Sequence, residues 1–85
     1  MAMEDILVQI GKRLCKRRKE MGLTQEAMAE RLGMSTTFYG EIERGRKRLS
    51  IEKILLVYEQ TGMDPDYLLT GEGLRNQVAM EIFKN

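Results

Sequence analysis

Chemistry in this chain would have to come from very few side chains. Cys15 is the only cysteine and there is no histidine, so the commonest general base and zinc ligand is missing, and no internal disulfide or cysteine-based metal site can form. The acidic residues fall at spacings typical of solvated helix faces, and no phosphate-binding glycine loop or G-x-S-x-G motif occurs. We therefore expect no enzyme, no metal and no other cofactor. Cys15 is most simply a helix-packing residue, with redox sensing as the second interpretation.

The charged side chains point to binding instead. Fourteen basic and 13 acidic residues leave a net charge of +1, but two basic blocks flank an acidic segment at Thr24 to Glu43. The blocks consist of Lys12, Arg13, Lys16, Arg17, Arg18 and Lys19, and of Arg44, Arg46, Lys47, Arg48 and Lys53. Two such blocks can flank one surface that contacts phosphate groups. On charge alone, two solvated helix ends explain them equally well.

Composition indicates one globular domain that positions these residues. The chain has 85 residues, of which 42% are hydrophobic and 32% charged, so it can bury a single modest core. No apolar run approaches the roughly 18 residues of a membrane span, and Glu4 and Asp5 stand where a signal peptide would be basic. We therefore expect a cytoplasmic protein with no membrane segment.

Hydrophobic periodicity and capping residues predict an all-α fold of five helices, with no segment alternating like a strand. The predicted helices run from about Glu4 to Met21, Thr24 to Leu32, Thr36 to Arg44, Ser50 to Gly62 and Asp64 to Leu69. Residues 1–72 form the expected domain, and 73–85 a short C-terminal helical extension. The side chains expected on the inner face of the fourth helix are Ile51, Ile54, Leu55 and Tyr58.

The connection between the second and third helices predicts a helix-turn-helix. Gly33 ends one helix and Ser35 caps the next, so the two helices must cross steeply. The segment from Gly22 to Gly45, GLTQEAMAERLGMSTTFYGEIERG, resembles the helix-turn-helix of the phage repressor and Cro family, which includes xenobiotic-response-element-type regulators. The likeness extends from Ile10 to Leu69. It implies a compact repressor-like domain that binds a double-stranded DNA operator as a transcriptional regulator, expected to be a repressor.

The third helix carries the expected DNA-reading side chains. With Tyr39 facing the core, the opposite side of the helix should lie in the major groove. The resemblance implies base contacts by Thr36, Thr37 and Glu41 and a phosphate contact by Gln25. Threonine can hydrogen-bond a base edge or contact a thymine methyl, and glutamate can accept from the cytosine amino group. The residues expected to hold the DNA backbone are Arg44, Arg46, Lys47 and Arg48.

Five residues in or facing the third helix carry further expectations. Gly40, on the outward side, either lets the backbone approach DNA closely or relieves crowding inside the domain. Phe38 is expected to pack on the second helix rather than contact a thymine methyl. The Tyr39 hydroxyl should find a partner at the core edge. Arg18 and Glu43 both face inward by helical spacing, so we expect them to pair, and the family likeness supports this; the alternative leaves both at the core edge.

A second copy of the chain is an expected partner, because proteins with one helix-turn-helix generally bind DNA as dimers. Leu74, Val78 and Ile82 form a stripe at steps of four in the extension, which predicts either a dimerisation helix or a tail that packs on its own subunit or frays. The alternative to a DNA-binding regulator is an antitoxin-like or protein-interaction module with weak or no DNA binding. The acidic character of the third helix is the argument for that alternative.

Overall fold

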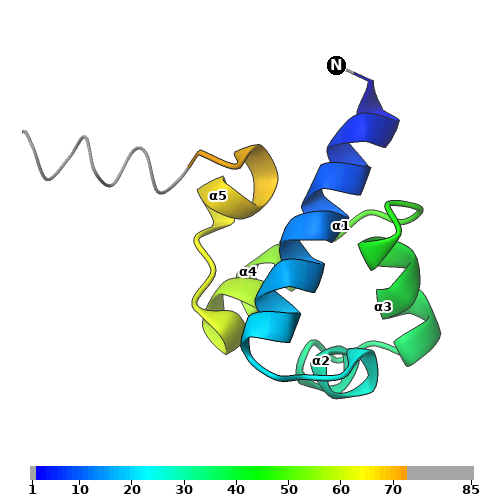
Figure 1. Ribbon diagram of the computed structural model, residues 1–85, viewed down its shortest axis with the longest axis vertical. Coiled ribbons are helices and arrows are strands. Elements are labelled where there is room, and N and C mark those ends of the chain that lie inside the picture. Colours follow the sequence, from blue (N-terminus) through cyan, green and yellow to red (C-terminus); the bar gives the residue numbers. More distant parts are fainter. Residues whose placement is uncertain (1, 73–85) are drawn as a thin grey trace, which may run out of the picture.

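The computed structural model describes residues 2–72 as five α-helices with no β-strand among them. The helices are α1 (Met3–Glu20), α2 (Gln25–Arg31), α3 (Thr36–Glu43), α4 (Ile51–Thr61) and α5 (Pro65–Thr70). In Figure 1, α1 runs through the middle of the domain, with α3 on one side, α5 on the other and α2 below its C-terminal end. The predicted all-α class and its five helices are confirmed. The predicted extension at 73–85 lies outside the described residues.

Polar side chains begin four of these helices where the sequence predicts them. Thr24, Ser35 and Ser50 each accept a hydrogen bond from the backbone N–H three residues later, at 3.0, 3.1 and 3.2 Å. Asp64 accepts from the N–H two residues later, at 3.0 Å. These bonds satisfy backbone donors that the first helical turn leaves free. Helix starts are thus decided locally, by one side chain and its neighbours.

One hydrophobic core joins all five helices. Its buried apolar residues are Leu14, Met28, Ala29, Leu32, Tyr39, Ile42, Val57, Met63 and Leu68. Gly11 gives the closest approach between α1 and α3. A Cβ placed there would lie 2.6 Å from the carbonyl oxygen of Ile42 and closer still to that of Glu43. Only glycine allows the two helices to pack at this separation, so α1 fixes the position of α3.

The prediction for the inner face of α4 is wrong except at Ile54, which is partly buried. The three other side chains of the predicted stripe are exposed: Ile51 at 78%, Leu55 at 53% and Tyr58 at 53%. The buried positions on α4 are Val57 and Thr61. No helix among residues 2–72 is long and apolar enough to span a membrane.

Thr61, a polar residue, lies on the buried face of α4. Its hydroxyl donates to the carbonyl oxygen of Val57 at 2.6 Å and accepts from the backbone N–H of Met63 at 3.1 Å. A buried hydroxyl with both bonds made carries little desolvation penalty. The polar residue is therefore tolerated in the core, and the stripe of Ile51, Leu55 and Tyr58 faces outward.

Candidate nucleic-acid interface

The turn between α2 and α3 has the geometry of a helix-turn-helix. Gly33 adopts a left-handed conformation, with φ of 66°, and the N–H of Met34 donates to the carbonyl oxygen of Ala29 at 3.0 Å. Ala29 is buried, as are Tyr39 and Ile42 on α3. Because α1 and α2 both pack against α3, one side of α3 is fixed to the core and the other faces outward.

The outward side of α3 carries most of the residues predicted to read DNA. Thr36, Thr37 and Phe38 are exposed at its N-terminal end, and Arg44 is exposed just beyond its C-terminal end. The Glu41 side chain is 25% exposed between two arginines. Phe38, at 40% exposure, is not covered by α2 as fully as the packing prediction implied. The two threonines are thus positioned side by side on a polar surface.

Gly40 is not part of an open surface, although helical spacing places it on the outward side of α3. It is buried, because the side chains of Arg44 and Gln25 lie over it. A Cβ there would lie 3.4 Å from Arg44 Nη2 and 3.7 Å from Gln25 Oε1, which are ordinary contact distances. The Arg44 guanidinium therefore packs over Gly40, and the backbone at Gly40 is not open to close approach by DNA.

Arg18 and Glu43 lie together between α1 and the end of α3. Arg18 Nε donates to Glu43 Oε2 at 2.7 Å and Nη2 donates to Oε1 at 3.2 Å, and the two side chains are only 12% and 5% exposed. Arg18 Nη1 also donates to the carbonyl oxygen of Leu23 at 2.9 Å. The ion pair ties α1, the start of the helix-turn-helix and the end of α3 into one unit.

The environment of Glu43 favours its charged form. Burial alone would raise the pKa of this carboxyl, but hydrogen bonding to Arg18, with contributions from Tyr39 and Gln25, holds it below its ordinary value. The Tyr39 hydroxyl is buried beside Arg18 and Glu43. Its pKa is raised, mainly by burial and to a smaller extent by the negative charge of Glu43. Among residues 2–72 the hydroxyl makes no hydrogen bond of standard geometry, but it interacts with Glu43, which is the neighbour at the core edge that the sequence led us to expect.

The Gln25 side chain belongs to this same network. Its Nε2 donates to Glu43 Oε1 at 3.0 Å, and its Oε1 lies near Gly40. Gln25 was predicted to grip a phosphate. One N–H of its amide is used in this bond, which leaves the second N–H as the side-chain donor that a phosphate could accept.

Two arginines of the first basic block are used inside the domain, so the interpretation that both blocks flank one phosphate-contacting surface does not hold for them. Arg13 Nη1 donates to the carbonyl oxygen of Leu68 at 2.9 Å, and Arg17 donates to that of Thr61 at 2.6 and 3.0 Å. Both arginines therefore stabilise the C-terminal ends of α5 and α4, where a positive charge is favourable. Long-range carbonyl partners, invisible in the sequence, draw these cations away from α3.

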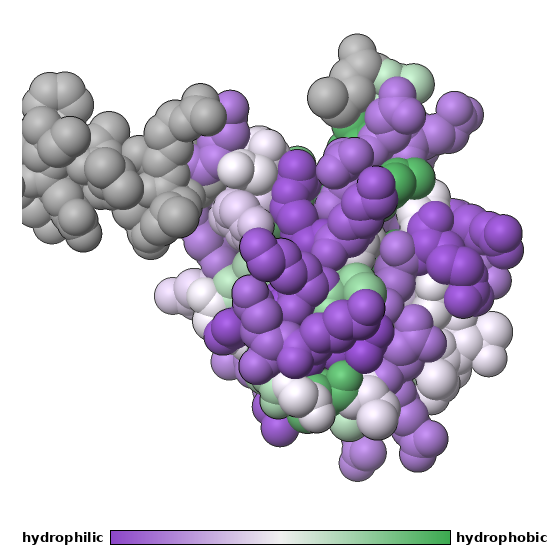
Figure 2. All heavy atoms as spheres, viewed as in Figure 1, coloured by the Kyte–Doolittle hydropathy of each residue, from purple (hydrophilic) through white to green (hydrophobic). Residues whose placement is uncertain are grey.

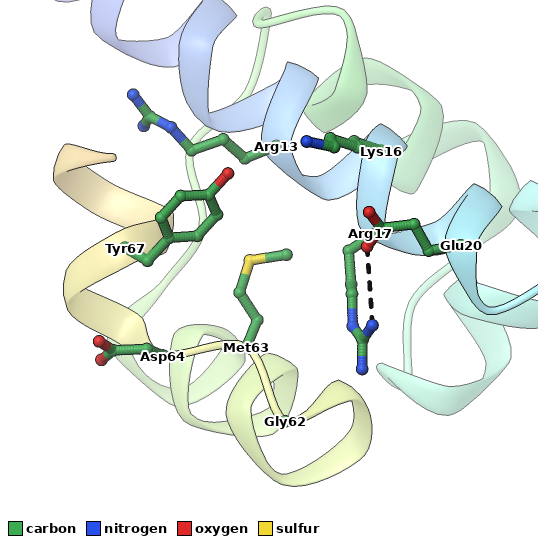
Figure 3. A pocket seen from close by; sticks show the side chains of 8 residues that line it. All are labelled: Arg13, Lys16, Arg17, Glu20, Gly62, Met63, Asp64 and Tyr67. Atoms are coloured by element: carbon green, nitrogen blue, oxygen red, sulfur yellow. Dashed lines mark ion pairs between the residues drawn. The ribbon is translucent and has the colours of Figure 1, made fainter. Parts of the chain in front are cut away.

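An open groove of about 310 Å³ lies on that side of the domain. Figure 3 shows Arg13, Arg17 and Tyr67 around it, with Met63 between α1 and the α4–α5 connection. Arg17 also pairs with Glu20 at 3.6 Å. Its lining residues come from α1, the α4–α5 connection and α5, and in Figure 1 α5 lies on the opposite side of α1 from α3. Arg13 and Arg17 are used within the domain. The groove is not part of the candidate interface.

The second block supplies the cationic loop next to α3. Arg46, Lys47 and Arg48 are all exposed. Lys53 is not part of this surface, because its Nζ donates to the carbonyl oxygens of Leu32 and Gly33 at the end of α2, at 2.8 and 3.3 Å. Figure 2 shows hydrophilic side chains gathered over α1 and at the side of α3 on the viewed face.

These features define a helix-turn-helix protein, and comparison with known proteins agrees. Residues 16–68, more than half of the chain, match the family described as Helix-turn-helix (HTH_3). The chain therefore belongs to this family, and the predicted likeness to phage-repressor-type regulators is confirmed.

Two solved structures are similar over most of the domain. The restriction-modification controller protein C.AhdI from Aeromonas hydrophila has a TM-score of 0.68 and 34% identity, covering 73% of this chain and 94% of that one. The P22 c2 repressor, solved in complex with a synthetic operator, has a TM-score of 0.69 and 31% identity, with the same coverage. The propionyl-CoA carboxylase regulator of Cereibacter sphaeroides is 34% identical over 65 residues, which are 76% of this chain and 14% of that protein. The chain thus spans about one seventh of that curated relative.

Proposed function

We propose that this chain binds a double-stranded DNA operator through the outward side of α3 and regulates transcription as a repressor. The observation that carries the proposal is that α3 is fixed by α1 and α2 on one side and presents exposed Thr36 and Thr37 on the other, next to an exposed cationic loop. The similar P22 c2 protein is a repressor solved with an operator. Such a regulator has no need of catalysis and acts in the cytoplasm.

The surface divides into residues that read bases and residues that hold phosphates. Thr36, Thr37 and Glu41 are the proposed base contacts, since side chains of this side of α3 enter the major groove when the helix does. The proposed backbone contacts are Gln25, Arg44, Arg46, Lys47 and Arg48. Arginine and lysine in a loop beside the groove set register and attract phosphate without reading sequence.

Replacing Arg46 and Arg48 together by alanine is expected to weaken binding to every duplex, whereas Thr37→Ala should mainly reduce sequence preference. Two lost phosphate contacts lower the slope of log K against log salt by about 1.8, at about 0.9 per contact. Loss of one base contact costs at most about 1–3 kcal/mol of discrimination. The measurement is a salt series on an operator selected from a random duplex library and on unselected duplex.

Lys16→Ala is the control for that experiment, because Lys16 is exposed on the groove side of α1, away from α3. It removes a positive charge without touching the proposed surface, and its salt slope should match that of the unaltered protein. Unchanged binding in both the Arg46/Arg48 and Thr37 variants would defeat the assignment. Failure of the unaltered chain to select any sequence would favour the protein-interaction module instead.

The proposed homodimer has a candidate surface that the sequence did not indicate. Ile51, Leu55 and Tyr58 form an exposed apolar stripe along α4, and such contiguous stripes mark interfaces. A two-fold axis across α4 would bring two copies of the stripe together. Three side chains from each copy fall short of the roughly 1,000 Å² of a specific interface. We propose that the remaining area comes from the extension, 73–85, with its stripe of Leu74, Val78 and Ile82.

Leu55→Lys is expected to shift the chain from dimer to monomer at micromolar concentration, since a charge would be buried at the centre of the stripe. Analytical ultracentrifugation measures the change. Gln60→Lys is the matched control, because it adds the same charge at an exposed polar position of α4. A Leu55→Lys variant as dimeric as the control would place the contact elsewhere.

A further inference from the structure

Glu41 is the one acidic side chain on the outward side of α3 that contacts both flanking arginines. Its Oε1 accepts from Arg44 Nη2 at 3.3 Å, and its Oε2 lies 3.7 Å from Arg46 Nη1. The carboxylate is 25% exposed, against 51% and 69% for the two arginine side chains. One carboxylate thus neutralises part of the positive charge that would meet the DNA backbone.

Gly40 keeps the first of these contacts close to the helix. Arg44 Nη2 and Nη1 lie 3.4 and 3.5 Å from the position where a Cβ of Gly40 would stand. The Arg44 guanidinium therefore packs against α3 beside Glu41. Arg44 must consequently leave this position to contact a phosphate.

Phosphate must compete with Glu41 for both arginines. Exposed ion pairs are weak, so a phosphate can displace the carboxylate from either guanidinium. The released carboxylate then faces a duplex that is densely negative, which opposes binding. A base edge changes this balance only if it offers a hydrogen-bond donor in the major groove, as the amino groups of cytosine and adenine do, while guanine and the thymine O4 offer acceptors.

We infer that Glu41 determines specificity by weakening the phosphate contacts of Arg44 and Arg46 on every duplex, and that an operator recovers the loss by presenting an exocyclic amino group to the released carboxylate. The inference rests on the proposed DNA binding of α3. Glu41 would thus lower the affinity for all duplexes and raise the affinity for an operator that presents the amino group. Affinity for random DNA is thereby kept low without removing the arginines that the operator complex needs.

Glu41→Gln tests this with little change of shape, because the amide keeps one acceptor oxygen and loses the charge. We expect affinity for random-sequence duplex to rise roughly fivefold, the equivalent of one exposed ion pair. The ratio of operator to random affinity should fall by at least the same factor. Both dissociation constants are measured by fluorescence anisotropy over a range of salt, after circular dichroism has established that the variant is folded.

Glu30→Gln is the matched control, since Glu30 is exposed on α2 and its replacement changes the net charge equally. Its operator-to-random ratio should stay within twofold of the unaltered protein. Equal effects of the two variants would overturn the inference, because net charge alone would then account for them. Weaker random-DNA binding by Glu41→Gln would also overturn it and would make Glu41 a residue that prepares the arginines for phosphate. If the unaltered chain bound no duplex, the proposed function itself would fail, and this inference with it.

Discussion

Replacing Arg18 by methionine, with Glu43 left in place, is expected to lower the free energy of unfolding by roughly 3–5 kcal/mol. The carboxylate would stay buried, at 5% exposure, without its charged partner, and the carbonyl oxygen of Leu23 would lose a donor. Domains of this kind are stable by about 5–15 kcal/mol in total. The variant should therefore unfold at a much lower urea concentration, measured by circular dichroism.

Two companion variants separate the ion pair from general effects. Lys12→Met removes a positive charge from an exposed position of the same helix and should change stability by no more than about 0.5 kcal/mol. The double variant Arg18→Met/Glu43→Leu removes both charges and should recover much of the loss, because no buried charge is left unpaired. A double variant as unstable as the single one would contradict this explanation.

The pH dependence of stability gives a second measurement of the same pair. The pKa of Glu43 lies below its ordinary value of 4.5 in the folded chain. Its contribution is therefore complete above pH 4.5 and is lost as the pH falls through the lower folded value, where the carboxyl takes up a proton. Stability should fall more steeply below pH 4.5 in the unaltered protein than in Glu43→Gln. Parallel curves for the two proteins would show that other groups cause the acid sensitivity.

Gly11→Ala is expected to cost about 3 kcal/mol or more, at the upper end of the range for overpacking. The added methyl would meet backbone atoms of Ile42 and Glu43, which cannot move unless α1 and α3 separate. This cost exceeds the roughly 1 kcal/mol that alanine gains over glycine inside a helix. Because α1 positions α3, DNA binding should weaken as well, and both effects are measurable by urea unfolding and fluorescence anisotropy.

Gly40→Ala is the control that isolates this clash. It makes the same substitution inside α3, where the new methyl meets only the ends of the Arg44 and Gln25 side chains, at 3.4 Å or more. We expect it to be neutral or to stabilise the chain by up to about 1 kcal/mol. Similar losses in the two alanine variants would mean that the close approach at Gly11 does not govern stability.

Local sequence determined the helices and the turn that joins the motif. Thr24, Ser35 and Ser50 cap helices through bonds to residues three positions away. Gly33 supplies the left-handed residue of the turn. Residues this close in the chain contact each other independently of the tertiary structure. Residue type and spacing were therefore enough to predict these caps and the turn. The exposed threonines of α3 followed from helical periodicity alone.

The long-range pair of Arg18 and Glu43 was also predictable, since two charges on core-facing positions leave each other as the obvious partner. The rotation of α4 was not. Its two candidate faces have the same helical spacing, and the face that is buried includes Thr61, whose hydroxyl makes two hydrogen bonds inside the core. A hydropathy pattern gives no sign that a buried hydroxyl is satisfied.

The partners of the basic side chains depended on the tertiary structure. Arg13 and Arg17 reach carbonyl oxygens 55 and 44 residues along the chain, at helix ends that come within reach of α1 only in the folded domain. Glu41 meets its arginines because α3 ends and the chain turns at Gly45, where φ is 78°. Charge type and the positions of the helices were thus properties of the sequence, whereas the partner of each charge depended on which helix ends the folded chain brought within reach.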